Sequence, residues 1–159
     1  GTGLYMAGEL GALALASVVS ARAIADEARA PALLVVGLVL SGLAQVAMVT
    51  PDVALSFAFR AVHGVGDGIV ITTLYVTVGR LFRVERIGGN AGVVVFLTML
   101  GATAGSVVYG PFGAAHGYGA ALIVGGALTG SLAALLLVVA PPAVLRRPRP
   151  SGGPRRNER

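Results

Sequence analysis

The sequence contains no cysteine and no lysine, and only 12% of its 159 residues are charged. Without cysteine, the chain has no disulfide, no thiol nucleophile and no thiolate metal site. Its two histidines cannot form a structural zinc site by themselves, and no phosphate loop or catalytic triad pattern is present. We therefore expect no metal, no cofactor and no enzymatic activity. The lack of lysine beside abundant alanine, glycine, valine and arginine is typical of a GC-rich prokaryotic coding bias.

Charge is also absent from three long apolar runs, at residues 32–50, 87–115 and 117–145. Each run is long enough to cross about 30 Å of hydrocarbon at about 1.5 Å per residue. The mean hydropathy is +0.84, and a soluble domain would have roughly 25% charged residues. We therefore predict an all-α integral membrane bundle of five transmembrane helices. Their ranges are about 4–20, 31–50, 53–81, 90–109 and 118–140.

Individual residues indicate where these helices begin and end. Pro31 suits a first helical turn, and Asp52 is a candidate N-cap for the third helix. Asn90 is the expected cap of the fourth helix, which we predict to end near Pro111. The tail from Arg146 is rich in arginine, proline and glycine and has too little apolar surface to fold, so we expect it to be disordered.

Eleven of the twelve arginines fall on one side of the membrane if every predicted helix crosses it. The positive-inside rule makes this side cytoplasmic, which places the N-terminus outside and the C-terminus inside. We expect a multi-pass protein of a prokaryotic cell membrane. The high sequence pI then indicates attraction to anionic lipid headgroups rather than to nucleic acid. The eleven are Arg22, Arg29, Arg80, Arg83, Arg86 and six arginines between residues 146 and 159.

The twelfth arginine, Arg60, lies inside the third predicted helix together with His63 and Asp67. At 100° per residue the three side chains share one stripe, and they span about 10 Å along the axis. Glu9, in the first predicted helix, is a further candidate that faces either a cavity or the external interface. Ionisable groups at membrane depth are costly and usually mark a transport pathway.

Two interpretations of this stripe remain open. In the functional one, Asp67 and His63 exchange protons while Arg60 binds an anionic group or changes their proton affinity. In the structural one, the three side chains satisfy one another and fix the packing of the helix.

Glycine is abundant, with 24 residues, and much of it recurs at four-residue spacing. Small residues at this spacing let membrane helices approach closely. Three glycines lie within one and a half turns of the third helix, which weakens the helix and predicts a sliding or bending contact. The candidate packing or gating glycines are Gly64, Gly66, Gly68, Gly101, Gly105 and Gly110.

The segment 59–68 reads Phe-Arg-Ala-Val-His-Gly-Val-Gly-Asp-Gly. It resembles the Arg-x-x-Gln-Gly-x-Gly-x-Ala signature in the fourth helix of major facilitator superfamily transporters. His63 stands where that family often has glutamine, and Gly68 where it has alanine. The pattern Gly101-x-x-x-Gly105, followed by glycines around Pro111, is similar to the glycine-rich fifth or eleventh helix of the same family.

The resemblance implies that the five helices correspond to helices two to six of a six-helix half. The basic tail favours the C-terminal half, which would be helices eight to twelve, with at least one helix preceding them. The implied activity is secondary transport of a small solute by alternating access, proton-coupled as symport or antiport. The implied partners are the lipid bilayer, the solute, protons and the N-terminal half. The alternative is a membrane module that packs against partners through its glycine faces and transports nothing.

Overall fold

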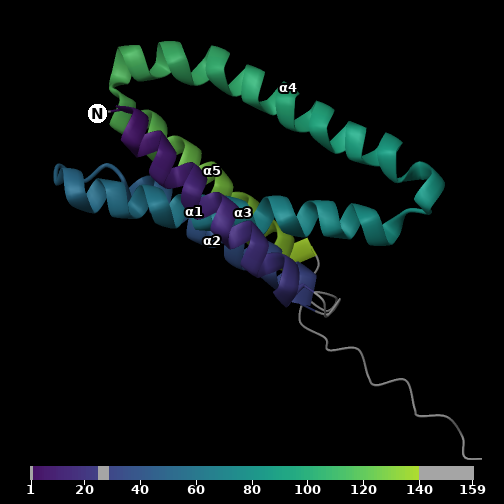
Figure 1. The fold of residues 1–159 in the computed structure, drawn as a ribbon. Coiled ribbons are helices and arrows are strands. Elements are labelled where there is room, and N and C mark those ends of the chain that lie inside the picture. Colours follow the sequence, from purple (N-terminus) through teal and green to yellow (C-terminus); the bar gives the residue numbers. More distant parts are fainter. Residues whose placement is uncertain (1, 25–28, 140–159) are drawn as a thin grey trace, which may run out of the picture.

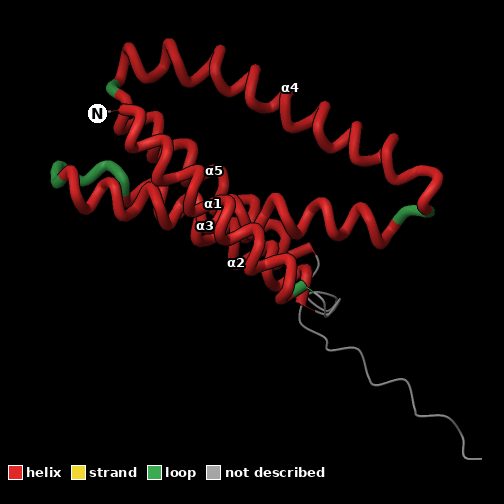
Figure 2. The backbone as a smooth tube through the Cα atoms, viewed as in Figure 1, coloured by secondary structure: helices red, strands yellow, loops and turns green. Residues whose placement is uncertain are grey.

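The structure, a computed structural model, describes residues 2–24 and 29–139, and all regular structure in these ranges is helical (Figures 1 and 2). All five helices are long and apolar enough to cross a membrane. The predicted all-α membrane bundle is therefore confirmed. The helices are α1 (Thr2–Ala23), α2 (Ala30–Ala47), α3 (Val53–Leu81), α4 (Val84–His116) and α5 (Tyr118–Val139). The tail predicted to be disordered lies outside the described residues.

The ends of α2 and α3 follow from the residues singled out in the sequence. Pro31 lies in the first turn of α2, where a missing N–H costs no hydrogen bond. The side chain of Asp52 accepts a hydrogen bond from the backbone N–H of Leu55 at 2.9 Å and caps α3. α2 ends at Ala47 rather than at the predicted residue 50, because the chain tightens into a turn over residues 48–50.

α4 is much longer than the sequence analysis predicted, so both of its predicted ends were wrong. Asn90 is not a cap: it lies inside the helix, and its side-chain amide donates to the carbonyl of Arg86 at 3.0 Å. Pro111 also lies inside the helix; membrane helices tolerate such interruptions. The helix ends instead at His116 and is followed by Gly117, whose φ of 88° favours glycine.

α3 is the centre of the packed part of the molecule, since it packs against both α1 and α2, and α2 in turn packs against α5. α4 departs from this group and arches away from it between its two ends (Figure 1). Of the α4 residues whose burial is described, only Gly113 is buried. Large apolar side chains of α4, such as those of Phe96 and Leu100, are therefore mostly exposed.

The α3 glycines lie where neighbouring backbones come closest. A Cβ added to Gly64 would overlap the carbonyl oxygen of Glu9, and one added to Gly68 would overlap the carbonyl oxygen of Leu13, both in α1. On the other side of α3, a Cβ on Gly66 would lie only 2.6 Å from the backbone nitrogen of Ser41 in α2. This close approach sets the register of α3 against both neighbours and thereby positions its polar side chains.

The two ends of the bundle differ in charge. Arg22, Arg80 and Arg83 lie at one end, which we call the Arg80 end. The beginning of α1, the turn around Asp52 and the turn at Gly117 lie at the other, the Asp52 end (Figure 1).

Candidate functional site

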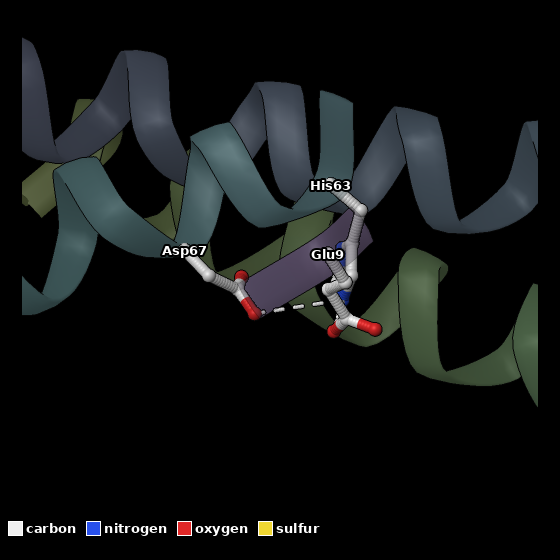
Figure 3. Close-up of side chains that lie close together, drawn as sticks. All are labelled: Glu9, His63 and Asp67. Atoms are coloured by element: carbon white, nitrogen blue, oxygen red, sulfur yellow. Dashed lines mark ion pairs between the residues drawn. The ribbon is translucent and has the colours of Figure 1, made fainter. Parts of the chain in front are cut away.

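The four predicted ionisable candidates meet between α1 and α3, and three of them are shown in Figure 3. The Nε atom of Arg60 lies 2.7 Å from Oε2 of Glu9. Nε2 of His63 lies 3.5 Å from Oδ2 of Asp67 and 4.0 Å from Oε1 of Glu9. Glu9 is therefore the acidic partner of Arg60, whereas the structural interpretation had expected Arg60, His63 and Asp67 to satisfy one another.

A fifth residue, Ser41 of α2, completes the cluster and was missed in the sequence. Its hydroxyl donates to Oδ1 of Asp67 at 2.7 Å and lies 2.9 Å from Nδ1 of His63. Its backbone carbonyl lies 3.1 Å from the same nitrogen. The available signal was that Ser41 is the only hydroxyl in the long apolar run at residues 32–49.

These hydrogen bonds determine which nitrogen of His63 carries the proton in the neutral ring. The carbonyl of Ser41 can only accept, and its hydroxyl has already donated to the ionised carboxylate of Asp67. Nδ1 must therefore be the donor. The lone pair of Nε2 then faces two carboxylates, from Asp67 and Glu9. A proton bound at Nε2 removes this repulsion.

The charge of the cluster changes with that one proton. Two carboxylates and one guanidinium leave one negative charge when His63 is neutral, and none when it is protonated. The side chains of Glu9 and His63 are only 18% and 15% exposed, so water screens these charges weakly. The Arg60–Glu9 contact is an ion pair without an aligned hydrogen bond, because the N–H of Nε does not point at the buried oxygen.

The ligand atoms of Glu9, His63 and Asp67 all lie within 4.8 Å of one another, which is close enough for three ligands of one metal ion. The guanidinium of Arg60 stands beside this space, at 2.7 Å from Glu9. Its fixed positive charge repels a divalent cation and competes for one of the carboxylates. The arrangement therefore favours a proton over a metal ion.

A large cavity, of about 1900 Å³, opens beside the cluster at the Asp52 end. Its walls come from the first turns of α1, α3 and α5 and from the last turns of α2 and α4. Most lining side chains are apolar. Among the described residues that line it, Arg60 alone carries a formal charge, so it connects the cavity to the cluster. The polar lining residues are Tyr5, Gln45, Arg60, Ser106, Tyr109 and Tyr118.

At the Arg80 end, α1 and α3 are joined directly. The guanidinium of Arg80 donates to the backbone carbonyl of Ile24 at 2.7 Å, immediately after the end of α1. The Ile24 side chain is fully buried there. Basic side chains bind the free carbonyls at a helix C-terminus, so this contact holds the two helices together at the end opposite the cavity.

The predicted packing glycines fall into two groups. Gly64, Gly66 and Gly68 contact neighbouring backbones, and α3 runs through them without interruption. Gly101 and Gly110, both in α4, have no other segment of the described chain within 4 Å of an added Cβ, and Gly105 has only the Tyr109 ring at 3.8 Å. A packing or gating role for the α4 glycines stays a prediction.

Comparison with known proteins agrees with this architecture. The family model of the Major Facilitator Superfamily matches residues 1–158. The chain therefore belongs to this superfamily, a family of membrane transporters. No curated protein and no solved structure matches the chain.

Proposed function

We propose that this chain forms part of a proton-coupled secondary transporter, in which the cluster of Glu9, Ser41, Arg60, His63 and Asp67 binds and releases the coupled proton. One observation carries the proposal: Nε2 of His63 faces the carboxylates of Asp67 and Glu9 while its other ring nitrogen is held by Ser41. Protonation at this atom neutralises the cluster. Histidine is suited to this role because it changes charge near neutral pH.

The proton must reach the cluster from water and leave it on the other side. Asp67 is the most exposed acidic member, at 35%, and is the route by which a proton would enter or leave. The cavity at the Asp52 end and the Arg80–Ile24 contact at the other end are the features expected of a transporter open on one side. Alternating access would require the Arg80 contact to break.

We also propose the orientation and the partners of the chain. The positive-inside rule assigns the Arg80 end and the tail to the cytoplasm. The basic tail favours helices eight to twelve of a twelve-helix transporter in a prokaryotic cell membrane. The N-terminal half would then cover the exposed apolar surface of α4. The same surface would also suit a module that only packs against partners, which is the alternative function.

The test is uptake by the full transporter in sealed vesicles, with a panel of organic anions, cations and neutral solutes. The parent should accumulate at least one of them when a pH gradient is imposed. Asp67→Asn should lose this accumulation and still exchange the solute across the membrane, because it removes the titrating group and keeps the size of the side chain. Arg60→Lys should slow transport, since an ammonium does not reproduce a planar guanidinium.

Asp52→Asn is the matched control, because it removes a carboxylate outside the cluster and leaves a good helix cap. It should transport like the parent. Uphill transport by Asp67→Asn at the parental level would show that Asp67 is structural. A folded parent that exchanges no solute of the panel would favour the packing module.

A further inference from the structure

The guanidinium of Arg60 has strong hydrogen-bond donors that face only weak acceptors. Nη2 lies 3.1 Å from the sulfur of Met6, and Nη1 lies 4.0 Å from the sulfur of Met48. Thioethers accept hydrogen bonds poorly. Only the Nε side of the group is next to a carboxylate, that of Glu9. The terminal nitrogens therefore remain available to a better acceptor.

These donors lie at the wall of the cavity. Arg60 is the one charged residue in the described lining, and the space of about 1900 Å³ is bounded mainly by apolar and aromatic side chains, including Phe57, Tyr109 and Tyr118. A purely apolar ligand would leave the guanidinium unused, and a cation would be repelled by it. A methionine side chain is flexible and can move aside for an incoming ligand.

We infer that the cavity binds an amphipathic organic carboxylate, with the carboxylate on the terminal nitrogens of Arg60 and the apolar body against the aromatic side chains. A planar guanidinium and a carboxylate form paired, charge-assisted hydrogen bonds. The transport of this ligand rests on the proposed function, but its binding does not.

Charge then couples the ligand to the proton. When His63 is neutral, the cluster has a net charge of minus one with Arg60 included, and a bound carboxylate adds a second negative charge. A proton at Nε2 of His63 offsets one of them. By linkage, the carboxylate must raise the affinity for the proton as much as the proton raises the affinity for the carboxylate. The two ligands bind together, which makes the transport a symport.

The experiment measures binding of 2-naphthoate to the full transporter in phosphatidylcholine nanodiscs, whose zwitterionic lipids do not compete for Arg60. Neutral 2-naphthamide and cationic 2-naphthylmethylammonium are the matched probes of the same size. We expect saturable binding of the anion, and binding of the other two at least about 10-fold weaker, because a charge-assisted contact is lost. Calorimetry in buffers of different ionisation enthalpy should record proton uptake on binding of the anion.

Arg60→Gln should weaken naphthoate binding by about 10-fold or more, whereas Arg86→Gln, an exposed arginine on α4, should leave it unchanged. If Arg60→Gln does not fold, the double variant Glu9→Gln/Arg60→Gln removes both charges of the ion pair and should show the same loss. Equal binding of the anion, amide and cation, or anion binding that survives loss of Arg60, would overturn the inference. Binding that depends on Arg60 but takes up no proton would leave the ligand assignment standing and contradict the proton-coupling proposal.

Discussion

Glycine lets the backbones approach closely at two helix contacts in this protein, but charged side chains lie at only one of them. Between α2 and α5, a Cβ on Gly42 would lie 2.8 Å from the carbonyl oxygen of Gly126, and one on Gly126 would lie 2.5 Å from that of Gly42. Between α1 and α3, Gly64 and Gly68 meet backbone carbonyls in the same way. α2 and α5 contain no aspartate, glutamate, arginine or histidine.

The α2–α5 contact shows that this chain packs helices tightly without ion pairs. The charges of the α1–α3 contact are therefore not needed for close approach, and apolar side chains could replace them at a lower desolvation cost. Both contacts border the cavity, but only the α1–α3 contact places a charged side chain, that of Arg60, in the described lining of the cavity, which supports a role in transport.

Removing one partner of the ion pair should have the largest effect on stability. Glu9→Gln leaves the Arg60 guanidinium without its carboxylate beside a mainly apolar cavity. We expect a loss of about 3 kcal/mol in the free energy of unfolding in mixed micelles. The double variant Glu9→Gln/Arg60→Gln should recover to within about 1 kcal/mol of the parent, because no uncompensated charge remains. A double variant as unstable as the single one would mean that the ion pair does hold α1 to α3.

Adding a methyl group at either glycine contact should have a smaller but clear effect. We expect Gly64→Ala and Gly126→Ala each to lower the free energy of unfolding by about 2 kcal/mol, since the helices must separate to admit the Cβ. Gly101→Ala in α4 is the control. It meets nothing in the described chain and should be neutral or stabilising by up to about 1 kcal/mol, because alanine favours a helix. Chemical unfolding followed by circular dichroism would measure all three, and a Gly64→Ala variant as stable as the parent would contradict the close contact.

The α3 side of the α1–α3 contact could be predicted from the sequence. Helical periodicity placed Arg60, His63 and Asp67 on one stripe, and Asp52 marked the beginning of α3 because its chemistry is local. The partners across the contact could not be predicted. That Glu9 meets Arg60, and that Ser41 reaches both His63 and Asp67, depends on the register between helices.

The ends of α4 were predicted wrongly for a related reason. Asn90 is a local signal for the beginning of a helix and Pro111 for its end, but in this long apolar segment the helix continues through both residues. Its end at Gly117 depends on a positive φ that the sequence shows only as one glycine among 24. The cavity was also beyond prediction, because five separate helix ends enclose it.

The most direct test of the proposal is the protonation state of the His63 ring, followed by ¹⁵N NMR of histidine-labelled transporter in nanodiscs. The His116→Gln background removes the other histidine of this chain, and the His63→Gln variant identifies the signal by difference. We predict that the neutral ring carries its proton on Nδ1, and that the ring takes up its second proton at Nε2 when the pH of the sample is lowered. A neutral ring protonated on Nε2, or a ring that takes up no proton when the pH is lowered, would contradict the assignment of Nε2 as the proton-binding atom.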